Sequence, residues 1–148
     1  MQWLYLFFAL MAGVGVSTQL GVNSQLRNTV INPILSALIS FSVGTIVLAI
    51  YMVANSRNSI PSFDVLRNIV WWKWMGGVLG ALYVTAAIMI APRIGAANFV
   101  SLVIAGQLLA TLWFDHFGYL GFTIHPVNIY RLLGAMLIVL GVYLIQKY

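Results

Sequence analysis

Five long apolar runs constrain this chain more than any other feature. A helix that crosses a membrane needs roughly 20 mostly apolar residues, and runs of about that length follow one another here. They cover residues 3–26, 33–53, 71–91, 94–114 and 127–145. Only 6% of the residues are charged, against about 25% in a soluble domain. The sequence therefore predicts an all-α integral membrane protein in which five transmembrane helices form a single domain over residues 1–148.

Polar connections of different lengths separate these runs. Residues 28–32 predict a short turn before Pro33, which suits the first turn of a helix. Residues 54–68 have loop chemistry, and residues 63–70 favour a short helix at the membrane surface. The pair at 92–93, Pro-Arg, predicts a tight turn between the third and fourth runs because proline lacks the N–H that a helix interior needs.

The composition excludes several kinds of chemistry. The chain has no cysteine and no glutamate, two histidines and two aspartates, so disulfides and cysteine-based metal sites are excluded. The few titratable side chains have no evident common site, and we expect no enzyme activity, no metal and no cofactor. The net charge is +5, but the basic residues are scattered at the ends of apolar runs. They are typical of anchors in the lipid headgroups, and nucleic acid is not an expected partner.

A polar stripe crosses the second half of the first run. Gly15, Gln19, Asn23 and Arg27 recur every four residues and therefore lie on one face of a helix. Amides in apolar sequence either bond to neighbouring helices or line a polar cavity. We favour the second interpretation and predict that Gln19 and Asn23 bind substrate. Gln107 stands alone in the fourth run, and both interpretations apply to it equally.

The remaining candidates are an aromatic pair and one carboxylate. Tyr83 and Trp74 would wall a substrate cavity, although packing and interfacial anchoring are the usual roles of such residues. Asp115 is the only carboxylate near a predicted span. It is either a proton-sensitive gate or the ion-pair partner of Arg131 across the short loop, and we favour pairing or solvation near the interface.

Five glycines are candidates for close helix packing. Small residues let helices approach closely in membranes. Gly76 and Gly80 have the small-xxx-small spacing, Gly134 and Gly141 are seven residues apart on one helix face, and Gly15 belongs to the polar stripe. The helices that these glycines contact belong either to the same subunit or to a partner.

The basic residues leave the orientation in the membrane undecided. Four of them lie on the side of the N-terminus and three on the other, namely Arg57, Arg67, Lys73 and Arg131 against Arg27, Arg93 and Lys147. The positive-inside rule needs a clear excess on one side. Such a balance is consistent with copies inserted in both orientations and paired antiparallel. Gln19 lies roughly 12 Å from the level of Arg27, and Gln107 roughly 21 Å from that of Arg93, so inversion would bring Gln107 of a partner near Gln19.

The order of these motifs resembles the YdcZ-like bacterial branch of the drug/metabolite transporter superfamily. The resemblance covers nearly the whole chain. In the first half it rests on Gly13, Gly15, Gln19, Asn23, Leu26, Ala37, Ser40, Phe41 and Gly44. In the second half it rests on Gly76, Gly77, Gly80, Ala81, Pro92, Gly95, Ala96, Gly106, Gln107, Asp115, Gly118, Pro126, Arg131, Gly134 and Gly141.

The resemblance implies a multi-pass protein of the bacterial inner membrane that exports small molecules. Some members of the superfamily are antiparallel dimers of four-helix chains, and others are ten-helix proteins with inverted halves. A five-helix chain is similar to one half of the latter, which dimerisation with a second copy or a related half-size partner would complete. One departure is important: the four-helix exporters carry a first-helix glutamate for proton-coupled export, and this chain has none.

From these observations we expect an exporter of small polar or amphipathic molecules that works as a dimer by alternating access. The rival interpretation is a membrane assembly factor or regulatory subunit, in which the amides only bond helices together. A passive channel would need a continuous polar path, and the fourth run is too apolar to supply one. Substrate identity and the coupling ion are not encoded in any motif of the chain.

Overall fold

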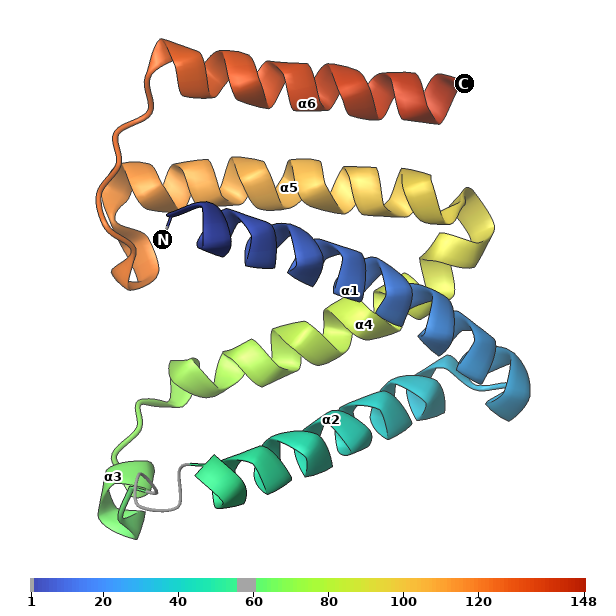
Figure 1. Cartoon of the computed structure of the whole chain (residues 1–148), viewed down its shortest axis with the longest axis vertical. Helices are drawn as coiled ribbons and strands as arrows, with labels where there is room; N and C mark the ends of the chain where they lie inside the picture. The colour runs from blue at the N-terminus through green and yellow to red at the C-terminus, as the bar shows by residue number, and fades with distance from the viewer. Residues whose placement is uncertain (1, 56–60) are drawn as a thin grey trace. The chain divides into compact units, whose positions relative to one another are not determined.

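The computed structural model describes residues 2–55 and 61–148, and these residues are mostly helical (Figure 1). The elements are α1 (Gln2–Val30), α2 (Pro33–Asn55), α3 (Phe63–Arg67), η2 (Trp71–Trp74), α4 (Met75–Ile94), α5 (Ala96–Phe117), η3 (Tyr119–Gly121) and α6 (Ile129–Lys147). Within the described ranges there is no strand. Five helical stretches are long and apolar enough to cross a membrane, which confirms the predicted all-α class and the number of spans.

The ends of the helices differ from the predicted ones by a few residues. The helix that we expected at residues 63–70 is α3, which ends at Arg67. Arg57, which we counted on the side of the N-terminus, lies outside the described residues. The turn predicted at residues 92–93 is wrong: Pro92 lies inside α4, and the chain turns at Gly95, whose φ is +92°.

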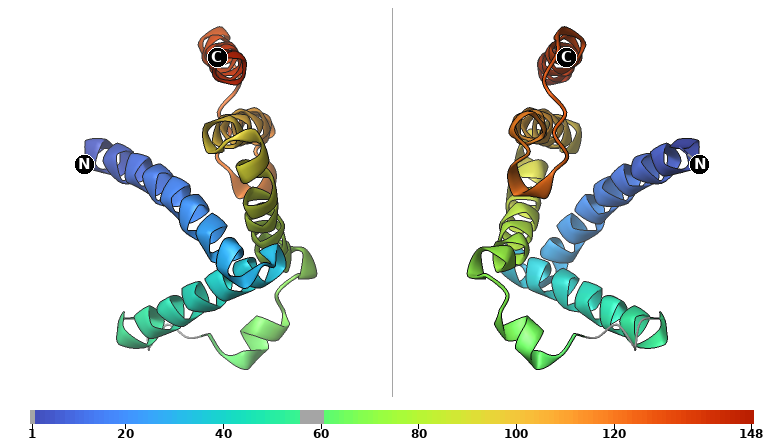
Figure 2. Two further views of the ribbon diagram at one scale, coloured as in Figure 1. Left: turned by 90° about the vertical axis from the view of Figure 1, so that its right-hand side faces the viewer. Right: turned by 90° about the vertical axis from the view of Figure 1, so that its left-hand side faces the viewer.

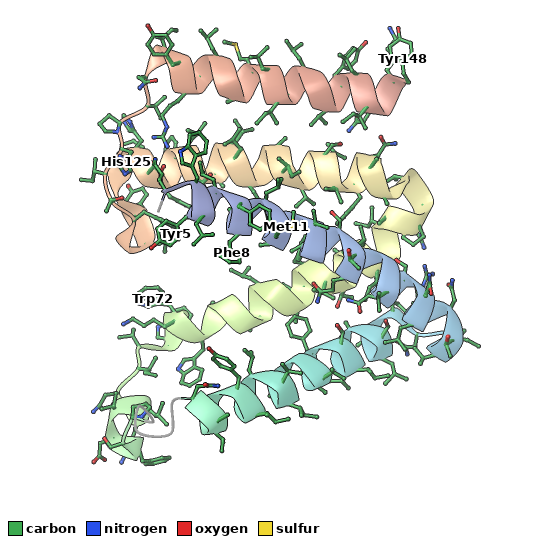
Figure 3. The ribbon with its side chains drawn as sticks, viewed as in Figure 1. Tyr5, Phe8, Met11, Trp72, His125 and Tyr148 are labelled. Atoms are coloured by element: carbon green, nitrogen blue, oxygen red, sulfur yellow. The ribbon has the colours of Figure 1, made fainter. Side chains whose placement is uncertain are left out.

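Large apolar side chains cover the surfaces of these helices. The described residues bury only ten hydrophobic side chains, whereas most leucines, isoleucines and phenylalanines of the spans are exposed. Figure 3 shows this for Tyr5, Phe8 and Met11, whose side chains project from the first half of α1. Exposed apolar surface on this scale needs a non-aqueous surrounding, so the hydrocarbon core of a bilayer is the solvent of this fold.

The contacts divide the chain into two compact units, residues 1–89 and 90–148, and each is described by itself. In the first unit, α1 and α2 meet at a tight turn and diverge from it (Figure 2). Asn32 caps α2, since its Oδ1 accepts hydrogen bonds from the backbone N–H groups of Ile34 at 2.9 Å and Leu35 at 3.1 Å. Ile31 completes the turn with a left-handed φ of +58°.

The second unit contains the α5–α6 hairpin. Gly118 ends α5 in the left-handed conformation, and its N–H donates to the carbonyl of Phe114. Asn128 caps the start of α6, and its Oδ1 accepts a hydrogen bond from the backbone N–H of Arg131 at 2.9 Å. Both ends of the connection are therefore capped by residues suited to that position.

Candidate functional site

Gln19 and Asn23 lie side by side on α1 and line a crevice against α4 in the first unit. Five apolar residues complete its wall: Val16, Leu20, Val84, Ala87 and Ile88. Asn23 is 4% exposed, whereas Gln19 is exposed. The crevice measures about 10 Å³, which is room for roughly one water molecule. The amides therefore face a narrow gap between two helices, too small in this conformation for a substrate.

A buried serine joins α2 to the polar stripe. The hydroxyl of Ser36, which is fully buried, donates to the backbone carbonyl of Asn23 at 2.9 Å. One residue further along, Ala37 packs with Val84 and Ile88 of α4, and Tyr83 packs against this cluster. Contacts from α2 therefore hold both helices that wall the crevice.

The fourth residue of the stripe, Arg27, bonds to the backbone of α4. Its Nη1 donates to the carbonyl oxygen of Ile88 at 3.4 Å. In a regular helix that oxygen accepts the N–H of the residue four positions later, which here is Pro92 and has none. Since Ile88 is fully buried, an unpaired carbonyl would be unfavourable. Arg27 supplies the missing donor, which explains why α4 continues past Pro92 as far as Ile94.

The side chains of Gln19 and Asn23 form no hydrogen bond with any other described residue. The bonds of this part of α1 all involve its backbone, the hydroxyl groups of Thr18 and Thr29, or the guanidinium of Arg27. An amide carries two donors and an acceptor with two lone pairs. Both side chains are therefore available to a ligand, to water or to another chain.

The other predicted site residues occupy three different places. Tyr83 adjoins the crevice through the α2–α4 cluster. Trp74 lies exposed in η2, at the start of the third span, and does not line the crevice. Gln107 lies exposed on α5 in the second unit, where its backbone carbonyl accepts the hydroxyl of Thr111 at 2.8 Å.

Helix bounds give the distance of each amide from one end of its helix. Gln19 lies eleven residues before the end of α1 at Val30, and Gln107 lies eleven residues after the start of α5 at Ala96. Each is therefore roughly 16 Å along its helix from that end. A residue near the midplane of a hydrocarbon core of about 30 Å keeps its depth when a copy is inverted.

Asp115 forms the ion pair that was one of its two predicted roles. Its Oδ2 accepts a hydrogen bond from Nη2 of Arg131 at 2.5 Å. Nη1 of Arg131 donates to the carbonyl of His125 at 2.6 Å, and the N–H of His125 donates to the carbonyl of Asp115 at 2.9 Å. These bonds close the loop between α5 and α6. Its role as a proton-sensitive gate stays a prediction.

Four of the five packing glycines have open space around them. A Cβ built at Gly15, Gly76, Gly134 or Gly141 would have no atom within 4 Å, whereas at Gly80 it would lie 3.6 Å from the ring of Phe41. Gly80 therefore packs against α2 in the first unit. The other four glycines make no such contact within the described part of the chain.

The hydrogen bonds of three side chains in these contacts could not be predicted from the sequence. Ser36, Arg27 and His116 act on backbone groups, and His116 accepts the N–H of Val127 on its Nδ1 at 3.1 Å. A bond to a backbone group does not depend on the residue type of its partner, so no sequence motif predicts it. Among the described residues, no group of three histidine, cysteine or acidic side chains is arranged to hold a metal ion.

Five membrane-spanning helices and an amide-bearing face against a narrow crevice define a multi-pass membrane protein with polar groups in its interior. The chain belongs to the family described as "Putative inner membrane exporter, YdcZ", which it matches over residues 4–144. It is 27% identical over 146 residues to the inner membrane protein YdcZ of Escherichia coli strain K12, covering 99% of this chain and 97% of that protein. The comparison with solved structures gave no match. The chain is thus a multi-pass inner-membrane protein of a transporter family.

Proposed function

We propose that this protein exports small polar or amphipathic molecules by alternating access, as a dimer of antiparallel copies. The observation that carries the proposal is the pair Gln19 and Asn23, two adjacent amides without side-chain partners facing a crevice between α1 and α4. Unpaired amides at membrane depth are unfavourable. A substrate with hydrogen-bonding groups would satisfy them.

Widening of the crevice is the motion that this mechanism requires. A small-molecule site usually encloses about 300–1,000 Å³, far more than the crevice holds. The bond from Arg27 to Ile88 ties α1 to α4 at one end of the crevice. We expect the helices to separate about that point, so that the amides are exposed to one side of the membrane at a time.

The antiparallel pairing rests on three features of the chain. Basic residues are divided almost evenly between the two sides, so no strong signal fixes one orientation. Gln107 and Gln19 each lie eleven residues from one end of their helices, which supports similar depths and a shared level in an inverted pair. The faces at Gly134 and Gly141 are open, which leaves α6 free to pack against a second chain.

The experiment compares the small molecules released by cells. Cells that produce the wild-type protein are compared by mass spectrometry of the medium with cells that produce Gln19→Ala/Asn23→Ala. We expect the wild type to raise extracellular levels of particular compounds and the double variant to lose most of that increase, because the substrate loses its hydrogen bonds.

Val22→Ala is the matched control. Val22 is an exposed residue of α1 outside the crevice, so export should be unchanged while the membrane abundance of all three proteins stays equal. Full export by the double variant would refute the amide site. Loss of dimer assembly without a change in released compounds would instead favour an assembly factor.

A further inference from the structure

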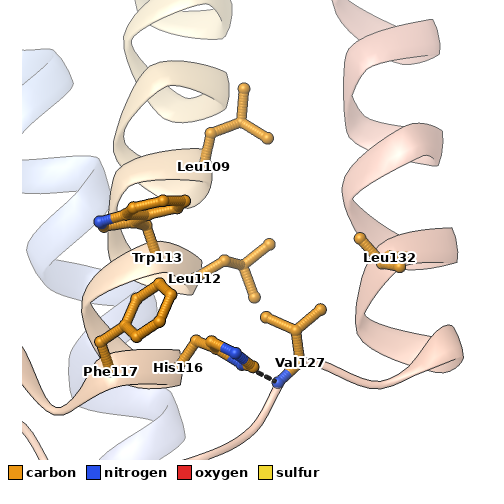
Figure 4. Close-up of a pocket in the computed structure, with 7 residues that line it drawn as sticks. All are labelled: Leu109, Leu112, Trp113, His116, Phe117, Val127 and Leu132. Carbon is orange, nitrogen blue, oxygen red and sulfur yellow. Dashed lines mark hydrogen bonds between the residues drawn. The ribbon is translucent and has the colours of Figure 1, made fainter.

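Two apolar hollows follow each other along the α5–α6 hairpin of the second unit. The first measures about 350 Å³ and is lined chiefly by Leu109, Leu112, Trp113, His116, Phe117 and Leu132 (Figure 4). The second measures about 360 Å³ and continues along α6 past Ala135 and Val139 to Leu140. Leu109 and Leu132 line both. Together they form a continuous apolar groove.

A polar hollow lies at the loop before α6. It measures about 490 Å³ and is lined by His125, Pro126, Asn128 and Arg131. Val127, which lies between two of these residues in the chain, also lines the first apolar hollow. Figure 3 shows His125 on this loop, at the end of α5. The residues that line the polar hollow therefore alternate along the chain with two that line the apolar groove, Val127 and Leu132.

Arg131 gives the polar hollow spare hydrogen-bond donors. A guanidinium carries five N–H donors, and Arg131 uses one on Asp115 and one on the carbonyl of His125. Its side chain is 32% exposed. Three donors remain for a group with several acceptor oxygens, and planar guanidinium forks match phosphate geometry. The imidazole of His125 forms no hydrogen bond to another described residue.

The position of the groove in the membrane matches the two halves of a lipid. The loop precedes Ile129, the first residue of α6, and so lies at the level of the headgroups. From Leu132 to Leu140 the groove runs for roughly 12 Å along α6. This is a little less than half of a hydrocarbon core of about 30 Å, or the acyl region of one leaflet.

We propose that the α5–α6 hairpin binds one membrane phospholipid, with its phosphate at Arg131 and His125 and an acyl chain in the groove. The spare N–H donors of Arg131 favour a phosphate, which has several acceptor oxygens. The apolar groove in the hydrocarbon region favours a lipid over free phosphate. A second copy of the chain would cover the apolar groove but would leave the polar hollow unoccupied. The site is separate from the Gln19–Asn23 crevice and does not depend on the proposed export activity.

Trp113 lines the first hollow and can report on occupancy. We would purify and delipidate a full-length variant in which Trp3, Trp71, Trp72 and Trp74 are phenylalanine. Titration with dioctanoylphosphatidylglycerol should change the emission of Trp113 saturably. Dioctanoylglycerol, which has the same chains and no phosphate, should bind about tenfold more weakly because it lacks charge-assisted hydrogen bonds. Inorganic phosphate alone should have no effect.

Two substitutions on α6 test the groove. Val139→Phe narrows the second hollow, whereas Leu137→Phe lies outside both hollows, and both positions are exposed. We expect phospholipid affinity to fall at least about fivefold for Val139→Phe and to stay unchanged for Leu137→Phe.

Arg131→Lys tests the contact with phosphate. It keeps a positive charge near Asp115 but loses the planar guanidinium fork, and it should reduce the preference for phospholipid over diacylglycerol.

Several results would overturn the proposal. Emission changes that do not saturate would indicate that the lipids partition non-specifically into the detergent micelle. Equal affinities for the two dioctanoyl compounds would show that the phosphate is not recognised. An effect of inorganic phosphate alone would show a free-anion site. A change of Trp113 emission with protein concentration alone would show that a second copy occupies the groove.

Discussion

The guanidinium of Arg27 in α1 bonds to a carbonyl of α4 that lacks a partner in its own helix. The carbonyl of Ile88 lacks its helical partner because Pro92 follows four residues later, and the guanidinium from α1 takes that place. The two bonded residues are 61 positions apart in the chain. Such a bond explains both the continuity of α4 and the close approach of α1 beside the amides.

A double-mutant cycle tests this bond. Arg27→Met should lower the free energy of unfolding by about 1–3 kcal/mol, because a buried carbonyl loses its donor. Pro92→Ala restores an N–H that reaches Ile88, so Arg27→Met should matter much less in that background. Thermal unfolding of the purified proteins in one detergent would measure both effects. Equal destabilisation in the two backgrounds would show that Arg27 does not serve this carbonyl.

Ile31 holds a conformation that β-branched residues rarely adopt. Its φ is +58°, in the turn between α1 and α2, and its side chain is exposed. Ile31→Gly should raise the free energy of unfolding by roughly 1 kcal/mol, since a left-handed conformation is unfavourable for L-residues by about that amount. Ile34→Gly, also exposed but inside α2, should lower it, as measured by thermal unfolding. Destabilisation by Ile31→Gly would contradict this account of the turn.

Among the elements, the α5–α6 connection depends most on glycine. Gly118 has a φ of +67°, and a Cβ there would lie 2.8 Å from Cγ1 of Ile124. Gly121 has a φ of +86° but open space around it. The two positions therefore separate backbone strain from a steric clash within one connection.

Alanine at each position measures the two effects. Gly121→Ala should lower the free energy of unfolding by roughly 1–2 kcal/mol through its backbone alone. Gly118→Ala should lower it further because Ile124 must also move. Thermal unfolding of both variants in the same detergent gives the comparison. Equal losses would mean that Ile124 makes room without strain.

Apolar patterning was sufficient to predict the spans but not their ends. Lipid selects continuous apolar runs, so α1, α2 and the three later spans follow from composition and length. The position of the turn after the third span did not follow from Pro92, because its effect depends on a donor from α1. The Asp115–Arg131 pair was predictable as one alternative, since opposite charges flank a short loop.

The candidate site was predictable at the level of a helix face. The four-residue spacing places Gln19 and Asn23 together, and the structure has them on one crevice. The partner helix was not predictable, because Val84, Ala87 and Ile88 carry no polar signal. Whether Gln107 of another copy joins these amides stays a prediction.

For the whole molecule, the proposed chamber requires two copies in opposite orientations. Gln19 lies eleven residues before the end of α1 and Gln107 eleven residues after the start of α5, so we expect an inverted partner to present Gln107 near the depth of Gln19. The division of basic residues, four against three, permits both orientations. The proposed assembly therefore depends on dual insertion.

The most direct test is the orientation of the C-terminus in native membranes. The chain contains no cysteine, so a single cysteine placed after Tyr148 can be labelled from either side by a membrane-impermeant reagent without interference. Dual insertion predicts that about half of the copies are labelled from each side, as expected when positive charges give no strong bias. Labelling from one side alone would contradict the antiparallel homodimer and leave an oppositely oriented, related chain as the required partner.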